Sequence, residues 1–306
     1  MFSGVASSIP SPALSPGSLI FECQTHRRSD DTPPPYPLVY PGTLGHVSDE
    51  RRWRLIVQSY TSRQLSFASD KLPAVAGIVS LMPQATRSRY LAGLWSHSLL
   101  EDLLWNVMPS SARSTTVMTY RFEEQQSPSW SWASLKQGVL WNEMHNFEPL
   151  VEVLDAQCGV IGLNAFGMVS GGHVTLRGRL TPCRVTHSYQ KGQHHAYIVR
   201  PDGTRSAQQW FLGDGMLVAS TSGNHPALQP VARRATPQME NTLPGDFDAA
   251  AAVLSVARVK NWRIEHVGLV VSWSKTRPGY IERIGLIMGL STEWFEQGEL
   301  TVITLL

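Results

Sequence analysis

Apolar residues recur with a helical period in the N-terminal part of the chain. In WRLIVQSY (53–60), the large apolar side chains stand at positions i, i+3, i+4 and i+7, which share one face of a helix. In SDKLPAVAGIVSLM (69–82), Ser69 or Asp70 is the expected cap of a second helix that carries Pro73 in its first turn. The pattern therefore predicts two short helices here.

A third helical pattern follows, and then the period changes to that of strands. Ser98 and Glu101 have the spacing of a capping box, and the leucine-rich stretch after them predicts a helix that ends before Pro109. Beyond Trp130, apolar and polar residues alternate, as in HVTLRGRL (173–180), which predicts a half-buried strand. Similar short runs recur up to the C-terminus, separated by turn sequences such as PDGT and GDG.

This order of elements, short helices and then strands, predicts an α+β protein whose antiparallel sheet forms a sandwich or a partial barrel. Segment 1–50 holds eight of the 20 prolines and has no periodic apolar stripe, so we expect a flexible lead-in. Residues 51–306 are expected to form a single domain, with a mobile loop over the polar, Pro-rich stretch 221–248.

Charge and cysteine content narrow the classes of partner and compartment. The net charge of +2 gives no broad electrostatic attraction to nucleic acid or to an anionic membrane. No apolar run approaches the roughly 18 residues that a membrane span needs. Cys23, Cys158 and Cys183 are widely spaced, which suits a reducing compartment better than a disulfide framework. We expect a cytoplasmic protein with no nucleic-acid partner and no membrane span.

Three segments carry familiar motifs in a fixed order. RQLSFASDKLPAVAGIVS (63–80), RYLAGLWSHSLLEDLLW (89–105) and YRFEEQQSPSWSWASLKQGVLW (120–141) resemble the region that follows the HET domain in fungal heterokaryon-incompatibility proteins. In that region D-K-L-P-A, Y-L-A-G-L-W, a leucine-rich L-L-W helix and P-S-W-S-W-A-S occur in the same order. A weaker similarity covers about 249–305, through WRIEHVGLVVS, GYIERIGL and EWFE.

The HET domain itself opens with a stretch like Y-x-A-L-S-Y-x-W-G, and residues 1–50 hold nothing similar. The resemblance therefore implies a fungal intracellular protein that consists of the accessory half alone. Activities ascribed to the HET domain, such as cell-death signalling and nucleotide cleavage, are not carried over. No catalytic residue of the family maps onto this chain.

The sequence lacks the motifs that usually bring catalytic groups together. It has no G-x-S-x-G elbow, no G-x-x-x-x-G-K-[ST] phosphate loop, no H-E-x-x-H and no G-x-G-x-x-G. Cys183, His187, His194 and His195 do not have the spacing of a zinc site, so we interpret them as parts of a polar loop. We expect neither a metal nor a cofactor.

Ten tryptophans are the unusual feature of the composition. In SPSWSWASL (127–135), Trp130 and Trp132 would point to the same side of an extended segment. We favour core packing for them; the alternative is a cavity for an apolar ligand, in which an indole N–H or a serine hydroxyl donates to a carbonyl. The candidate ligand-binding residues are Trp95, Trp105, Trp130, Ser131, Trp132, Ser134 and Trp141.

Two functions from different classes fit these observations. The first is binding of an apolar small molecule by a stand-alone accessory-like domain. Its catalytic form would be a cofactor-free cyclase of the pericyclic, Diels–Alder type in specialised metabolism, which needs substrate orientation and a donor aimed at a carbonyl. The second is a non-catalytic recognition or regulatory module with a protein partner. The sequence favours the first slightly, because an isolated recognition half has nothing to control.

Removal of the lead-in tests the expected domain boundary. We expect limited proteolysis to leave a stable core that begins near Glu50, because a segment without an apolar stripe adds nothing to the core. Deletion of residues 1–45 should then leave the thermal unfolding transition unchanged. Loss of the folded state on deletion would show instead that the segment belongs to the fold.

Overall fold

The computed structural model describes residues 13–15, 18–22, 27–29, 47–63, 65, 67–108, 127–190, 193–203, 210–213, 216–217, 228–229, 247–261, 264–274, 279–289, 291–292, 294 and 298–306. Within 13–29, 186–197, 210–250 and 260–265, and at residue 68, only the backbone is described. The expected lead-in (1–50) and loop (221–248) fall mostly outside this description. It places three short strands and the first two residues of a helix (49–50) in the first, and one short strand and the first two residues of another (247–248) in the second. No helix in the described part is long and apolar enough to cross a membrane.

The first two predicted helices are confirmed. The described helices are α1 (Asp49–Thr61), α2 (Pro73–Ser80) and α3 (Leu99–Asp102), with 3-10 turns η2 (Ala68–Asp70), η3 (Pro83–Thr86) and η4 (Trp132–Ser134). α1 starts where the hydroxyl of Ser48 accepts a hydrogen bond from the N–H of Arg51, and it buries Trp53 and Val57. α2 begins directly at Pro73, and the residue at its cap position is Leu72 rather than Ser69 or Asp70.

The third predicted helix is wrong beyond its first turn. α3 ends at Asp102, and the next residues form β6 (Trp105–Val107), which pairs antiparallel with β7 (Val139–Trp141). Ser98 does not form the capping-box bond, because its hydroxyl donates to the Asp102 carboxylate at 2.8 Å. The helical spacing of the leucines therefore does not decide the structure here, because the pairing of β6 with β7 and the bond between Ser98 and Asp102 end the helix early.

The strands lie mainly in the second half of the chain, as predicted. They are β1 (Ala13–Ser15), β2 (Ser18–Glu22), β3 (Arg27–Ser29), β4 (Tyr90–Leu91), β5 (Leu94–Trp95), β8 (Glu148–Pro149), β9 (Glu152–Val160), β10 (Val169–Gln190), β11 (Gln193–Val199), β12 (Trp210–Gly213), β13 (Met216–Leu217), β14 (Leu228–Gln229), β15 (Phe247–Asn261), β16 (Ile264–Trp273), β17 (Ile281–Met288) and β18 (Glu299–Leu305), besides β6 and β7. Nine of the described strands belong to one large sheet.

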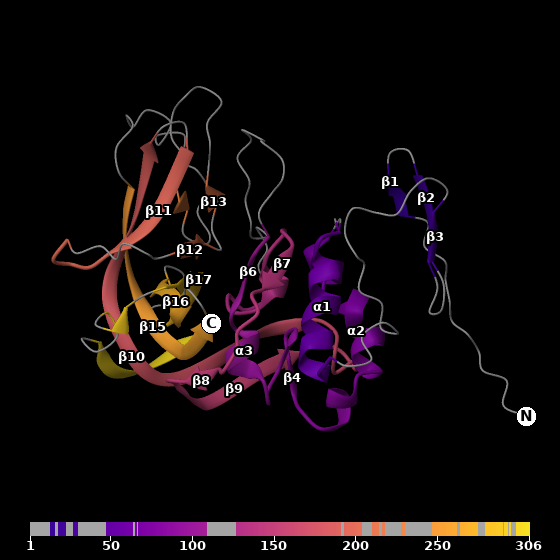
Figure 1. Ribbon diagram of the computed structural model, residues 1–306. Helices are drawn as coiled ribbons and strands as arrows, with labels where there is room; N and C mark the ends of the chain where they lie inside the picture. The colour runs from indigo at the N-terminus through magenta and orange to yellow at the C-terminus, as the bar shows by residue number, and fades with distance from the viewer. Residues whose placement is uncertain are drawn as a thin grey trace, which may run out of the picture.

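Five strands of the large sheet form a nearly closed ring. β10 pairs with β15, β15 with β16 and β16 with β17, all antiparallel, and β18 pairs back onto β10. The ring closes between β17 and β18 through a single parallel pair, Ile281 with Leu305. The strand β10, 22 residues long, bends so that its first half pairs with β9 and β18 and its second half with β11 and β15 (Figure 1). The predicted α+β fold with a partial barrel is confirmed.

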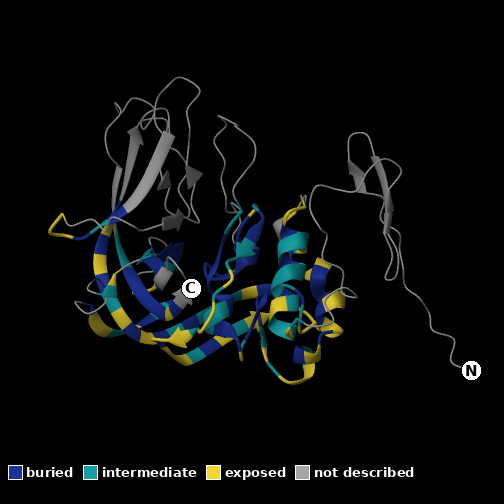
Figure 2. Cartoon of the chain, in the orientation of Figure 1, coloured by how far each residue is buried: buried dark blue, intermediate teal, exposed yellow. Residues whose placement is uncertain are grey.

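A shared core joins this barrel to the helical layer. Trp53 of α1 and Trp132 of η4 belong to the same cluster of buried side chains as Leu176, Leu269 and Leu286 of the barrel strands. α1 and α2 stand at one side of the barrel (Figure 1), and buried residues run from α1 through β6 and β7 into the strands (Figure 2). The layer and the barrel therefore bury their apolar faces against each other.

Candidate functional site

The seven residues singled out from the sequence come from one region, and most of them are closed to solvent. They lie on β5, β6 and β7 and in the segment around η4. The fully or nearly fully buried ones are Trp95, Trp105, Trp130, Ser131, Trp132 and Ser134, whereas Trp141 is partly buried. The structure thus brings all seven together around the core of the helical layer.

The segment SPSWSWASL is not extended, so that expectation is wrong. Trp130 lies in a turn, and Trp132 begins η4, because the hydroxyl of Ser131 accepts the N–H of Ala133 and bends the chain. Burial of both indoles is nevertheless confirmed, since neither Trp130 nor Trp132 has exposed surface. The single small residue between them, Ser131, lies close enough to the β4–β5 hairpin for its hydroxyl to donate to the carbonyl of Ala92.

Five of the seven candidates already use their donor group inside the fold. Each donates to a backbone carbonyl: Trp105 to Trp130, Trp132 to Gly93, Trp141 to Asp102, Ser131 to Ala92 and Ser134 to Ser131. A buried carbonyl needs such a donor, and its loss costs about 1–3 kcal/mol. These five side chains therefore hold the β4–β5 hairpin, η4 and β6 together.

Trp95 and Trp130 differ from the other five candidates. Their indole nitrogens are buried and have no hydrogen-bond partner among the described residues. The hydroxyl of Tyr90 and the side-chain amide of Gln84 are in the same condition. Each such group costs about 1–3 kcal/mol when it is buried without a partner.

Tyr90 and Trp95 face each other across the β4–β5 hairpin and belong to an aromatic cluster. Their ring centroids lie 5.2 Å apart, and Trp53 stands edge-on to both at 6.0 Å. Phe166 from the β9–β10 connection completes the cluster, 5.6 Å from Tyr90. Edge-to-face pairs of this kind add about 0.5–1.5 kcal/mol each to the apolar contact. The cluster fastens the hairpin to α1 and to the sheet.

Gly93 is the point of closest approach in this region. Its carbonyl accepts hydrogen bonds from the indoles of Trp53, at 3.0 Å, and Trp132, at 2.8 Å. Its φ is +100°, and a Cβ atom at this position would lie 2.5 Å from Nε1 of Trp132. Both the backbone conformation and the space therefore require glycine.

Arg283 of β17 enters the helical layer from the barrel side and is fully buried. Its guanidinium donates to the carbonyls of Leu103, at 2.7 Å, and Trp105, and it stacks 3.3 Å from the centre of the Trp105 ring. Its backbone N–H donates to the hydroxyl of Ser129 at 3.1 Å. The residue connects the barrel to α3, to β6 and to the segment before η4.

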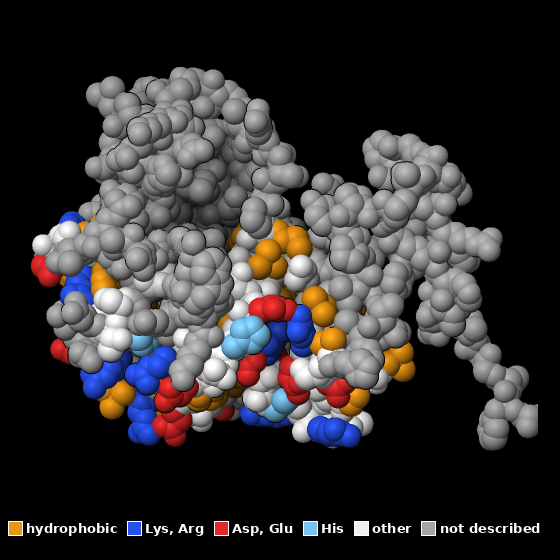
Figure 3. All heavy atoms as spheres, in the orientation of Figure 1, with side chains coloured by type: hydrophobic (Ala, Val, Ile, Leu, Met, Phe, Trp, Pro, Cys, Tyr) orange, Lys and Arg blue, Asp and Glu red, His pale blue; other side chains and the backbone are white. Residues whose placement is uncertain are grey.

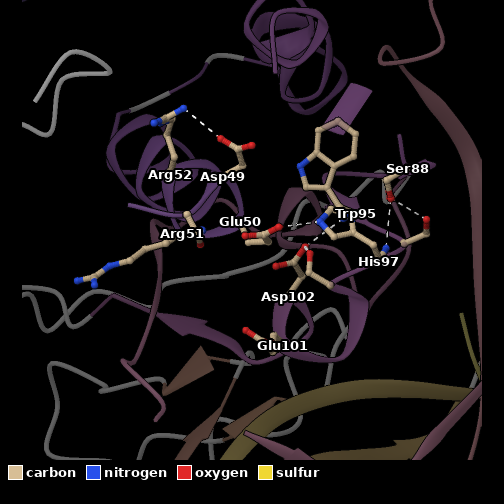
Figure 4. A network of polar contacts seen from close by, with 12 residues as sticks. Asp49, Glu50, Arg51, Arg52, Ser88, Trp95, His97, Glu101 and Asp102 are labelled. Carbon is tan, nitrogen blue, oxygen red and sulfur yellow. Dashed lines mark hydrogen bonds and ion pairs between the residues drawn. The ribbon is translucent and has the colours of Figure 1, made fainter. Parts of the chain in front are cut away.

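A network of polar contacts around Asp102 joins α1 to α3 and β5 (Figure 4). The buried carboxylate accepts from Arg54 at 2.8 Å, from the backbone N–H of Trp95 at 3.1 Å and from Ser98 at 2.8 Å. Burial raises the pKa of the Asp102 carboxyl, and these three donors oppose the rise. Arg54 reaches Glu101 as well, at 3.0 Å. Apart from Nη2 of Arg54, which is buried without a hydrogen-bond partner in the described part of the chain, the groups named here bond to one another, so the network is structural.

Charged side chains of both signs and histidines gather on the face drawn in Figure 3, near the middle of the described surface. In the close-up of Figure 4, Nε2 of His97 lies 3.1 Å from the carboxylate of Glu50. The nearby hydroxyl of Ser88 bonds to Ser96 and to the backbone N–H of His97, and no bond joins it to the imidazole. The group resembles an acid–base pair but does not activate this serine.

Lys71 is a buried amine, located in the turn before α2. Its Nζ donates to the carbonyl of Leu135 and lies 5.8 Å from the centre of the Trp132 ring. Burial lowers the pKa of Lys71 to about 7. The ammonium is therefore held in a place where the protein disfavours its charge, and it fastens the end of η4 to the turn.

The interpretation of the cysteine and histidine cluster as a loop is wrong. Cys183 and His187 lie on β10, His194 and His195 lie on β11, and the two strands pair as a hairpin. Burial raises the pKa of the Cys183 thiol to about 12. Among the residues with described side chains, no group of three His, Cys, Asp or Glu is placed to hold a metal ion; the three histidine side chains lie outside that set.

β9 forms an exposed border of the large sheet, a feature that the sequence pattern did not reveal. In the described part of the chain it pairs with β10 alone. Val153, Leu154 and Val160 are 36 %, 44 % and 43 % exposed, and Ile161 beyond the strand is 42 % exposed. An open strand edge with apolar side chains is a template for another strand. The sequence signal for this exposed strand was a pair of apolar residues on each side of D-A-Q-C-G (155–159).

Gly93→Ala tests the close approach to Trp132. We expect the free energy of unfolding to fall by about 2–5 kcal/mol, because overpacking costs about 1–3 kcal/mol and the left-handed backbone about 1–2 kcal/mol more. The measurement is chemical unfolding followed by tryptophan fluorescence. Gly77→Ala on α2 is the control, since nothing lies within 4 Å of its added methyl group. Equal stabilities of the two variants would contradict the close approach.

The lowered pKa of Lys71 predicts a pH dependence of stability. Because its pKa is about 7 in the folded protein and 10.5 ordinarily, unfolding takes up a proton between these values. The contribution of Lys71 to the free energy of unfolding is therefore lowest below pH 7, and it increases as the pH rises from about 7 to 10.5. Lys71→Met should remove this rise, so that the stability gap between wild type and variant changes by roughly 2 kcal/mol from about pH 7 to 9.

The Lys71 experiment compares the two proteins at each pH by chemical unfolding. Tyr60 and the buried thiols, whose pKa values are raised by burial, are common to both and cancel in the difference. A gap that stays constant with pH would show that Lys71 keeps its ordinary pKa.

Comparisons with protein-family models, with curated proteins and with solved structures each find no match for this chain. The similarity to the region after the HET domain accordingly stays a prediction carried by the motifs.

Proposed function

We propose that the chain is an intracellular recognition module, of the kind that accompanies the HET domain, and that it binds a protein partner along the edge of β9. The observation that carries this proposal is the edge itself. The strand has nine residues, and its side chains Val153, Leu154 and Val160 are a third or more exposed. A partner strand added there would gain backbone hydrogen bonds, while the exposed side chains would select its sequence.

The contacts of β9 support the proposal because they hold the strand rigid. On one face, Asp155 lies 2.8 Å from His173, and Glu152 pairs with Arg177. On the other face, Ala156 is buried in the common core. A strand that is already ordered loses little conformational entropy when it binds, so more of the contact energy appears as affinity.

Peptide selection tests the recognition function even while the partner is unidentified. A display library of random extended peptides is panned on the immobilised protein at low surface density. We expect enriched peptides with apolar residues at alternate positions, and slower amide exchange in β9 when such a peptide is bound. Leu154→Lys should abolish this binding, because a lysine on an edge strand blocks added strands.

Leu300→Lys is the matched control, since Leu300 is 71 % exposed on β18, outside the proposed edge. It should bind the selected peptides like the wild type. Peptides that bind all three proteins equally, with unchanged exchange in β9, would contradict the proposed surface.

A second candidate function is the binding of an apolar small molecule that carries a carbonyl group. The unpartnered indole nitrogens of Trp95 and Trp130 support it, because a carbonyl ligand would supply the missing acceptor. In its catalytic form the protein would be a cofactor-free cyclase, with a donor that polarises the reacting carbonyl. Loss of such a donor would raise the barrier by about 2.7–4 kcal/mol.

Native mass spectrometry after incubation with a fungal metabolite extract tests the second candidate. An added mass should appear on the wild type and disappear in Trp95→Phe or Trp130→Phe, which keep an aromatic ring but lack the donor. Trp273→Phe, at a position 65 % exposed, is the control and should retain the added mass. An extract that leaves no mass on the wild type would exclude small-molecule binding and leave the recognition module as the account.

A further inference from the structure

We propose that Arg200 binds an apolar carboxylic acid, whose carboxylate accepts two parallel hydrogen bonds from one edge of the guanidinium. Arg200 directly follows β11 and is only 9 % exposed. Arginine is almost never buried to this degree unless its charge has a partner. The site goes beyond the proposed recognition function, because it lies outside β9 and outside the seven tryptophan and serine candidates.

The donors of Arg200 define the kind of group that binds there. Nε and Nη2 are both buried, and neither has a hydrogen-bond partner in the described part of the chain. These two nitrogens form one edge of the planar guanidinium, on which two N–H groups point the same way. A carboxylate matches this edge, because its two oxygens accept both N–H groups at once. The guanidinium keeps its proton in proteins, so its charge persists in the buried position.

Two other arginines of low exposure show how this protein otherwise accommodates such a charge. Arg54 bonds to two carboxylates, and Arg283 bonds to two backbone carbonyls. Within the described ranges, the guanidinium of Arg200 has neither an ion pair nor a carbonyl acceptor. The acceptor for its edge is therefore expected from a bound ligand.

Trp294 orients the guanidinium of Arg200. The centre of its ring lies 4.7 Å from Cζ of Arg200, which is a cation–π contact. The indole is buried, and the carbonyl of Trp294 accepts a hydrogen bond from the hydroxyl of Thr181 at 3.0 Å. Stacking on the face of the guanidinium leaves the N–H groups in its plane available. The edge is thus oriented before a ligand binds, which reduces the entropy lost on binding.

The surroundings favour a ligand with an apolar body and a single charge. Trp294 belongs to a buried cluster with Cys183, Val185, Ile198, Val253, Val270, Ile284 and Ile287. Burial raises the pKa of the Cys183 thiol to about 12, so this cluster member is neutral. A phosphate monoester would bring nearly two negative charges next to apolar side chains, whereas a carboxylate brings one, which Arg200 neutralises.

Isothermal titration calorimetry with octanoate and benzoate as probes tests the class of ligand. Each acid joins one carboxylate to an apolar body, and the amides octanamide and benzamide are the matched neutral compounds. We expect an acid to bind the wild type at least tenfold more tightly than its amide, because the amide offers one acceptor oxygen to the edge. Inorganic phosphate should bind more weakly than the acid. Acids that bind no better than their amides, or that bind more weakly than phosphate, would overturn the proposed class.

Substitution of Arg200 tests the location of the site. Arg200→Met should raise the dissociation constant of the acid at least tenfold, and Arg200→Lys should not restore binding, because an ammonium lacks the two parallel donors. Arg184→Met is the matched control, since Arg184 stands on β10 opposite Val199, the neighbour of Arg200, and is exposed. It should bind the acid like the wild type. Equal binding by the wild type and Arg200→Met would overturn the site.

Thermal unfolding without ligand distinguishes a ligand site from a contact inside the chain. Arg200→Met should unfold at the same temperature as the wild type or a higher one, because it removes a buried charge that has no partner. A lower unfolding temperature would show that a group of the chain already serves this edge, and it would overturn the proposed ligand.

The acid site and the recognition function fail separately. Leu154→Lys, which should abolish peptide capture at β9, should bind the acid like the wild type. A protein that captures peptides through β9 and binds neither acid would overturn the acid site alone. A protein that binds an acid through Arg200 and captures no peptide would overturn the recognition function alone.

Discussion

The arrangement of the molecule depends on one buried side chain, Arg283. It leaves the barrel on β17 and ends between the carbonyls of Leu103 and Trp105, stacked on the Trp105 ring. Its backbone N–H bonds to Ser129, whose own N–H donates to the carbonyl of Leu306 at 2.8 Å. The barrel, its last strand, the turn before η4 and the start of β6 thus meet at a single residue. A planar guanidinium suits this place because it serves two carbonyls and a ring at once.

Around this junction, most of the buried tryptophans have a structural role, because they connect neighbouring segments by hydrogen bonds. With Arg283 on one side and Gly93 on the other, most indole and serine donors end on backbone carbonyls of adjoining segments. The helical layer then becomes a rigid cover over the sheet, and the exposed border at β9 is held in shape by that cover and by β10. The indole nitrogens of Trp95 and Trp130 are the exceptions, because they are buried without a hydrogen-bond partner among the described residues.

The sequence predicted the helices and strands that depend on the local periodicity of apolar residues. α1 follows from its apolar stripe, α2 from Pro73, and the strands of the barrel from their alternation. The leucines after Ser98 misled the helix prediction, because β6 needs β7, which lies more than thirty residues further along the chain. Of the candidate site, the sequence identified the right region and the burial of the tryptophans. It could not assign the destination of each donor, nor the role of Arg283, because these depend on carbonyls from distant segments. The edge of β9 was missed because exposure is a property of the assembled sheet.

The most direct measurement is the free energy of unfolding of Arg283→Met beside that of Arg177→Met. A hydrogen bond from a charged donor contributes about 1.5–3 kcal/mol, and Arg283 makes two, so its replacement should cost about 3 kcal/mol or more. Arg177 forms a surface ion pair with Glu152 and should cost no more than about 1 kcal/mol. Arg283→Lys should fail to restore stability, because an ammonium cannot serve both carbonyls while stacking on the ring. If Arg283→Met were as stable as Arg177→Met, the barrel and the helical layer would not depend on this junction.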